Sequence, residues 1–160
     1  MSSTPEPPSS RRRPHTHTPR KLHNQSCILL VTVCARDRKS LFARQAAMQT
    51  LLSAWEADKH WLVGRYVLLP DHMHFFCAPG HLPQPPLDHW MKKWKSHAGR
   101  NWPVPSEHPL WQRSHWDRQL RDIRQYDERW EYVRQNPVRY GLCTHPDEWP
   151  FQGELHRLIL

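Results

Sequence analysis

Residues 61–78 read WLVGRYVLLPDHMHFFCA, two apolar runs separated by a Pro-Asp pair. Each run is rich in β-branched, aromatic and long aliphatic residues, which is typical of buried strands, and Pro-Asp is a turn signal. The stretch therefore predicts a strand over 61–69 and a second strand over 72–78 that returns beside it.

The segments on either side of this hairpin show an alternating order of strands and helices. That order is typical of an α+β fold, a split βαβ sandwich of the ferredoxin-like or RRM-like kind, in which helices flank a mostly antiparallel central sheet and a further helix lies at the C-terminus. The other elements that we predict are a strand over 26–36, a helix over 41–60 with Ser40 as its N-cap, a helix over 87–102, a strand over 110–122, and a helix from about 127 that Pro137 stops or kinks.

Length and composition indicate one domain behind an N-terminal arm. The chain has 160 residues, a length that fits a single core. Residues 1–22 are rich in proline, arginine and hydroxyl side chains, so we expect a disordered basic arm, with the single domain over 23–160. The four cysteines form no CxxC pair, and no apolar run suits a signal peptide or a membrane span. These features favour a cytoplasmic protein without a membrane partner.

The formal net charge of +8 favours a polyanionic partner. Basic residues gather in the arm and on the predicted helix over 87–102. The arm can follow phosphates or stay solvated, and the helix can bind DNA or simply pack with a solvated basic face. The candidate phosphate contacts are Arg11, Arg12, Arg13, Lys92, Lys93, Lys95 and Arg100.

His72 and His74 lie on either side of one apolar residue in the predicted strand over 72–78. Side chains alternate across a strand, so both imidazoles project from the same face. A shared divalent cation would satisfy two neighbouring neutral histidines, whereas backbone groups or water are the alternative partners. A structural zinc site formed by these histidines with Cys34 and Cys77 is a further alternative, although the irregular spacing disfavours it.

The last predicted helix carries Tyr132 and Asn136, four residues apart and so on one surface. This spacing would present a nucleophile and an oxygen donor to the same pocket. The alternative is that Tyr132 is a core aromatic residue and Asn136 caps the helix before Pro137. Because proline disfavours helical angles at the preceding residue, Gln135 is a rival oxygen donor.

Three motifs in this order resemble those of a known family. LPDHMHFF, LWQRSHWDRQLRD and EYVRQNPVRYGL are similar to motifs of the REP-associated tyrosine transposases, a branch of the HUH single-strand DNA endonucleases with one catalytic tyrosine. The resemblance covers about residues 24 to 151. It implies that His72 and His74 bind the metal, that Tyr132 is the nucleophile, and that Asn136 completes the metal site.

The activity implied by the resemblance is a metal-dependent transesterification of single-stranded DNA. With Mg²⁺ or Mn²⁺ bound, Tyr132 would attack phosphorus to give a 5′-phosphotyrosine, so that strands are cleaved and rejoined without hydrolysis. His115 is a candidate base. Tyr126 and Tyr140 are not expected to act as nucleophiles, because neither precedes a suitable oxygen donor by one turn.

The partners implied are short DNA palindromes folded as hairpins, bound together with an unpaired strand, by a monomer or a homodimer. The tryptophans at 102, 111 and 116 can stack on bases or belong to the core. A non-catalytic hairpin DNA- or RNA-binding protein of the same fold is the alternative function.

Overall fold

The computed structural model describes residues 27–159, so the predicted arm, including Arg11, Arg12 and Arg13, lies outside the described residues. The described chain alternates strands and helices in the predicted order. Its elements are β1 (Ile28–Ala35), α1 (Gln45–Ala57), β2 (Trp61–Leu68), β3 (His72–Pro79), α2 (Leu87–Arg100), β4 (Trp111–Leu120), α3 (Ile123–Arg134), α4 (Asn136–Arg139) and β5 (Gln152–Glu154), with short 3₁₀ turns between some of them.

The strands form one antiparallel sheet in the order β4-β1-β3-β2-β5. The first four strands have the order of a split βαβ sandwich, which confirms the predicted α+β fold. The short strand β5 was not predicted. It pairs with the outer edge of β2, where Val67 lies opposite Gln152, and its three residues are too few to show a period in the sequence.

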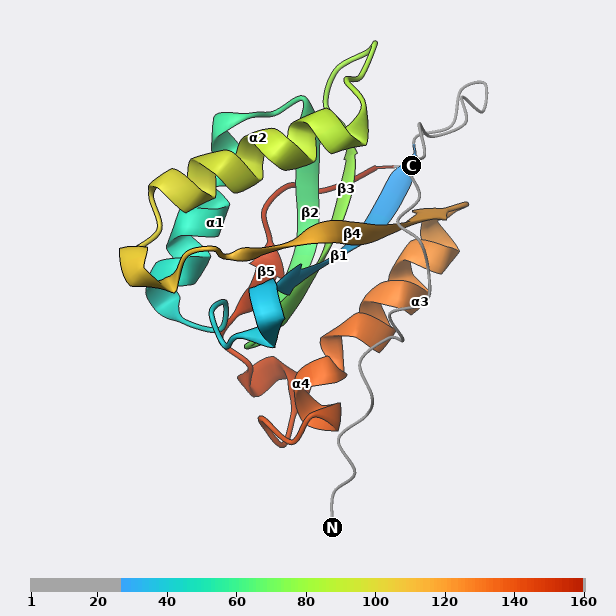
Figure 1. Cartoon of the computed structure of the whole chain (residues 1–160). Helices are drawn as coiled ribbons and strands as arrows, with labels where there is room; N and C mark the ends of the chain where they lie inside the picture. The colour runs from blue at the N-terminus through green and yellow to red at the C-terminus, as the bar shows by residue number, and fades with distance from the viewer. Residues whose placement is uncertain (1–26, 160) are drawn as a thin grey trace.

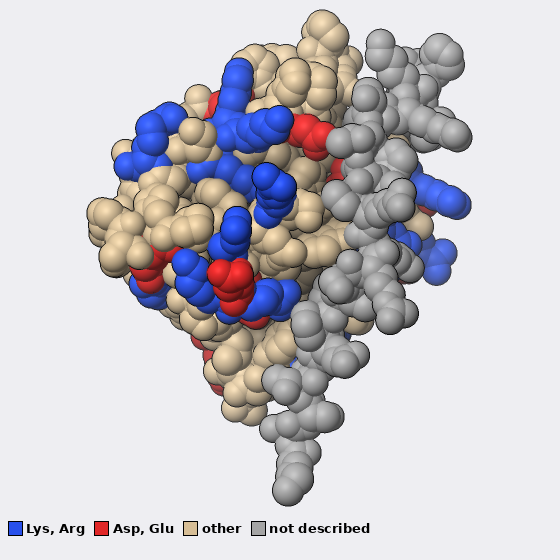
Figure 2. Space-filling view, in the orientation of Figure 1, with Lys and Arg blue, Asp and Glu red and all other residues tan. Residues whose placement is uncertain are grey.

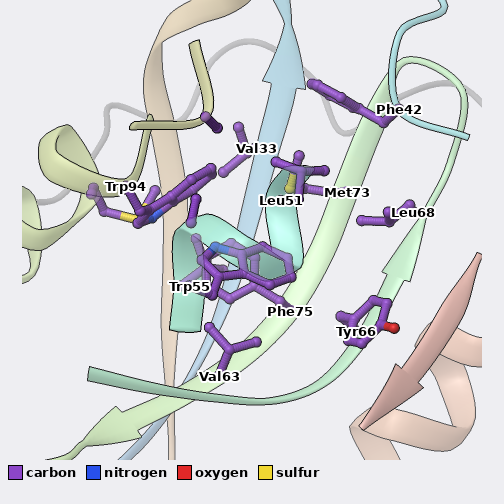
Figure 3. Close-up of a cluster of buried hydrophobic side chains, with 14 of the residues drawn as sticks. Val33, Phe42, Leu51, Trp55, Val63, Tyr66, Leu68, Met73, Phe75 and Trp94 are labelled. Carbon is purple, nitrogen blue, oxygen red and sulfur yellow. The ribbon is translucent and has the colours of Figure 1, made fainter. Parts of the chain in front are cut away.

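Helices cover both faces of the sheet (Figure 1). Helices α1 and α2 lie on one face, where Trp55 and Trp94 pack with Met73 and Phe75 of β3 (Figure 3). Helix α3 covers the other face, where Tyr126 and Val133 belong to a second cluster of buried residues. The sheet therefore has a helix-packed core on each side, and the second face also receives the even-numbered side chains of β3.

Two helices begin at other residues than predicted. The first begins at Gln45 rather than after Ser40, because the backbone N–H groups of Leu41 and Phe42 donate to the carbonyl of Pro70 and hold this segment against the β2–β3 turn. Helix α3 begins four residues before the predicted start.

The early start of α3 has a local cause. The carboxylate of Asp122 accepts a hydrogen bond from the backbone N–H of Gln125, which is an N-cap. At the other end, α3 ends at Arg134, and the turn α4 follows with Pro137 in its first positions. Pro137 therefore interrupts the helix as predicted.

No helix within residues 27–159 is long and apolar enough to cross a membrane.

Candidate metal and tyrosine site

Strand β3 presents His72 and His74 on the face of the sheet that α3 covers. The intervening Met73 and the following Phe75 belong to the core on the opposite face. The two imidazole centroids lie 5.1 Å apart with their planes nearly perpendicular. The predicted convergence of the two histidines on one face is confirmed.

Each histidine has one ring nitrogen held by a neighbouring side chain. The Nδ1 of His72 lies 2.8 Å from a carboxylate oxygen of Asp71, and since a carboxylate only accepts, this nitrogen carries the proton. The Nδ1 of His74 lies 2.8 Å from the hydroxyl of Thr32 on β1. Both rings are thereby oriented through Nδ1, which leaves Nε2 as the nitrogen that can bind a ligand.

The Nε2 of His72 is buried and has no hydrogen-bond partner among the described residues. His72 itself is 2% exposed. A buried polar atom without a partner costs stability, and with its proton on Nδ1 this nitrogen offers a lone pair. It is therefore suited to a cation, and the residues present fit a metal site.

The surroundings of His74 keep its imidazole neutral. Burial, the neighbouring His72 and then Arg38 lower the pKa of His74 to about 3, so His74 is neutral at physiological pH. Burial opposes ionisation of Asp71, but its bonds with His72 and Arg38 lower its pKa to about 2. Neutral imidazole is the form that binds a metal.

Asp71 links the histidines to Arg38, a connection that the sequence reading missed. The Nε of Arg38 donates to the second carboxylate oxygen of Asp71 at 2.9 Å, and its Nη1 lies 3.1 Å from the Sγ of Cys34. The position of Asp71 directly before His72 was the available signal, but Pro-Asp was interpreted only as a turn. Thr32 gave no signal, because only strand pairing places it opposite His74.

Tyr132 lies at the surface and is 56% exposed. The guanidinium carbon of Arg139 lies 4.0 Å from the centroid of its ring. The same guanidinium donates 2.8 Å to the amide oxygen of Asn136 and 2.6 Å to the carbonyl of Tyr132. The alternative that Tyr132 is a core aromatic residue is therefore wrong.

Asn136 and Gln135 have different surroundings. Asn136 is 8% exposed and joined to Tyr132 through Arg139. The amide nitrogen of Gln135 instead donates to Glu131 at 3.2 Å. Of the two oxygen donors, Asn136 is the one that the structure brings together with Tyr132.

Tyr140 connects this end of the chain to the histidines. Its ring centroid lies 5.6 Å from that of His72. Burial and then Asp71 raise the pKa of Tyr140, and the phenol of Tyr132 is near enough to add to the increase. Tyr140 is therefore in ring contact with His72 and within electrostatic reach of Tyr132.

The hypothesis of a zinc site with Cys77 is wrong. Cys77 projects into the core on the α1 and α2 side of β3, away from the even-numbered His72 and His74. Within residues 27–159, no group of three or more His, Cys, Asp and Glu side chains is placed to hold a metal.

The interpretation of His115 as a base is also wrong. His115 pairs with Val33, whose side chain lies in the core on the α1 and α2 side of the sheet, and directly opposite residues share a face. Its Nε2 lies 3.7 Å from Asp88 of α2. The sheet therefore separates His115 from His72.

The basic candidates on α2 lie across the sheet from the histidines. Lys92, Lys93 and Arg100 are exposed, and Figure 2 shows Lys and Arg side chains gathered on this side of the molecule. Lys95 is partly buried, and burial lowers its pKa to about 8. These residues form a surface separate from the histidine pair, and their role in DNA binding stays a prediction.

The three candidate stacking tryptophans divide between the faces. Trp102 is buried in the core beneath α1 and α2, and Trp111 packs against that core and donates its indole N–H to the carbonyl of Lys95. Trp116 pairs with Thr32 and so lies on the histidine face.

Comparisons with known proteins find similarity to transposases. No family model matches the chain. Over 128 residues it is 25% identical to the REP-associated tyrosine transposase of Escherichia coli (strain K12), spanning 79% of this chain and 74% of that protein.

Two solved structures share the fold. The structure of a REP-associated tyrosine transposase bound to a REP hairpin matches with a TM-score of 0.67 and 20% identity, over 83% of this chain and 79% of that chain. A candidate transposase from Deinococcus radiodurans R1 matches with a TM-score of 0.51 and 13% identity, over 71% of this chain and 93% of that chain.

Proposed function

We propose that this chain, which resembles the REP-associated tyrosine transposases in sequence and fold, is a metal-dependent endonuclease and transposase of single-stranded DNA. It would bind hairpins with unpaired flanks, and cleave and rejoin strands through a 5′-phosphotyrosine. The E. coli relative is named a REP-associated tyrosine transposase, and the similar solved structure is bound to a REP hairpin.

The observation that carries the proposal is the unpartnered, buried Nε2 of His72, in a pair whose two Nδ1 atoms are already held. His72, His74 and the amide oxygen of Asn136 would hold the cation. Nitrogen and amide oxygen ligands suit Mn²⁺ at least as well as Mg²⁺. When bound, the cation would supply Lewis-acid stabilisation of charge on the scissile phosphate.

The chain's own residues supply the nucleophile and its placement. The Oη of Tyr132 forms a bond to phosphorus while the bond from phosphorus to the 3′ oxygen breaks. The phenolic proton is lost and the leaving 3′ oxygen gains one, so the products are a 5′-phosphotyrosine and a 3′-hydroxyl. Because one phosphodiester replaces another, the reverse reaction on a new 3′-hydroxyl rejoins strands without ATP. The exposure of Tyr132 gives a strand access to this oxygen.

The test is covalent capture of DNA. A labelled hairpin with unpaired flanks, taken from the DNA beside the gene, is incubated with the protein and Mn²⁺ and resolved on a denaturing gel. We expect a covalent protein–DNA band that Tyr132→Phe abolishes and a chelator prevents.

Tyr140→Phe is the matched control, because the ring centroid of Tyr140 lies 5.6 Å from that of His72 but its hydroxyl should not be needed. Tyr126→Phe should likewise keep the band. Loss of the band in Tyr140→Phe with retention in Tyr132→Phe would show that the nucleophile is misassigned. Hairpin binding without any covalent product would favour the non-catalytic binding protein.

A further inference from the structure

A cavity of about 570 Å³ lies beside the proposed catalytic site, lined by Arg36, Asp37, Arg38, Gln112 and Arg113. We call it the arginine pocket. Its residues come from the turn that follows β1 and from the first residues of β4. Its volume is within the range of small-ligand sites, so it has room for one nucleotide unit.

The arginine pocket and His72 lie at the same end of the sheet. Strand pairing places Cys34, near the end of β1, opposite His72 at the start of β3. It also places Ala35 opposite Trp111 at the start of β4. A strand of DNA that reaches the histidines therefore passes this end of the sheet.

A chain of direct contacts also joins the two places. Arg38 lines the arginine pocket and holds Asp71 at 2.9 Å. Asp71 in turn holds the Nδ1 of His72 at 2.8 Å. Only one carboxylate stands between the wall of the pocket and a proposed metal ligand.

Two of the three arginines in the pocket are available to a ligand. Arg36 and Arg113 are exposed, and in the part of the chain that the structure describes neither guanidinium has a hydrogen-bond or ion-pair partner. Other arginines of the same chain are engaged by acids, as Arg44 is by Glu107 and Arg134 by Asp147.

The lining of the pocket is positive overall. It has three guanidinium groups and a single carboxylate, that of Asp37. Lys and Arg side chains also surround this part of the surface in Figure 2. The planar fork of arginine matches phosphate oxygens, and Gln112 adds an amide that can donate to or accept from a sugar or base.

We propose that the arginine pocket binds a backbone phosphate of the unpaired DNA strand next to the scissile phosphate, with Arg36 and Arg113 as the contacting residues. The inference rests on the proposed function and deepens it, because it assigns the place where the unpaired strand is held. A single strand is flexible enough to place one phosphate inside the pocket. The backbone of a duplex is too wide and stiff to do so, so the pocket suits the unpaired strand.

The test combines a protein change with a change in the DNA. Single neutral methylphosphonate linkages are placed at successive positions in the unpaired flanks of the hairpin, and binding is measured in the Tyr132→Phe protein so that no cleavage interferes. One linkage near the scissile position should weaken binding. When Arg36→Ala and Arg113→Ala are added to that protein, the same linkage should cause no further loss of DNA affinity.

Salt dependence gives a second readout. The slope of the logarithm of the affinity against the logarithm of salt concentration is negative, and it should become less steep by about 0.7 for each single-strand phosphate contact that is lost. The matched control is Arg121→Ala/Arg124→Ala, which removes two exposed charges beyond the opposite end of β4, Arg121 just after the strand and Arg124 in the first turn of α3. It should keep both the slope and the methylphosphonate effect.

The outcomes separate this inference from the proposed function. If the double variant at Arg36 and Arg113 binds with an unchanged slope and keeps the methylphosphonate effect, while the wild-type protein still forms the covalent product, the arginine pocket does not hold the strand. If the wild-type protein neither binds nor cleaves the DNA, the proposed function fails and this inference fails with it.

Discussion

The guanidinium of Arg139 lies over the ring of Tyr132, 4.0 Å from its centroid, and also donates to the side chain of Asn136. One side chain thus contacts both the proposed nucleophile and the proposed oxygen ligand. Cation–π contact and a charged hydrogen bond restrict the rotamers of an otherwise exposed tyrosine. Arg139 is therefore suited to position Tyr132.

Replacing Arg139 with methionine should lower the rate of covalent capture roughly tenfold or more, because a misplaced nucleophile loses reactivity steeply, while DNA affinity changes little. Arg139→Lys should recover only part of the rate, since an ammonium cannot both cover the ring and bond two oxygens. Arg134→Met is the control. Equal loss of rate and affinity in Arg139→Met would point to DNA contact rather than positioning.

Replacing Asp71 with alanine should weaken Mn²⁺ binding about 10- to 100-fold, the usual effect of removing a carboxylate that orients a histidine ligand. Without the carboxylate, the Nδ1 proton of His72 loses its acceptor and the ring is free to change tautomer. Titration calorimetry or Mn²⁺ paramagnetic resonance measures the affinity.

Asp37→Ala, which removes a carboxylate from the neighbouring turn, serves as the control for Asp71→Ala. Unchanged Mn²⁺ affinity in Asp71→Ala would show that His72 is not a ligand or does not depend on this bond.

Acid should destabilise the fold through His115. Burial and then Lys95 lower the pKa of His115 to about 4, against the opposing effect of Asp88. Between pH 6.5 and 4 the unfolded chain therefore binds a proton that the folded His115 does not, so the free energy of unfolding decreases as pH falls. The decrease due to this group is at most about 3 kcal/mol.

Urea unfolding of wild-type protein and His115→Gln at several pH values checks this prediction. The difference in the free energy of unfolding between the two proteins should change between pH 6.5 and 4, because His115→Gln should lose less stability on acidification. Parallel curves for the two proteins would contradict it.

The stability of the fold should depend on Trp55 in the aromatic core. Its ring contacts Phe75 and Trp94 with centroids 5.0 and 5.7 Å away, and its indole N–H has no partner among residues 27–159. Trp55→Ala should lower the free energy of unfolding by about 3–5 kcal/mol. Trp55→Phe should cost much less, because it keeps an aromatic ring and removes the unpaired donor. Thermal or urea unfolding gives both values, and equal losses of stability in the two variants would contradict this prediction.

Local patterns in the sequence predicted most of the fold. Apolar runs predicted the first four strands, and periodicity predicted three of the helices, because these elements bury one or both faces over many residues. The strand β5 and the start of α1 were missed. Both depend on contacts with distant segments, the edge of β2 and the carbonyl of Pro70.

By itself, the sequence determined that His72 and His74 share a face, because the period of a strand is fixed by backbone geometry. The same alternation places Cys77 on the other face. The sequence did not fix the relation of Tyr132 to Asn136, because α3 ends at Arg134 and Asn136 begins α4. Only the tertiary structure decided which ring nitrogen stays free and which groups hold the rings. Thr32 reaches His74 only through the pairing of β1 with β3, which no local spacing encodes. Asp71 and Arg139 are close to their partners in the sequence, but the turn and the helix end decide that their side chains point toward them.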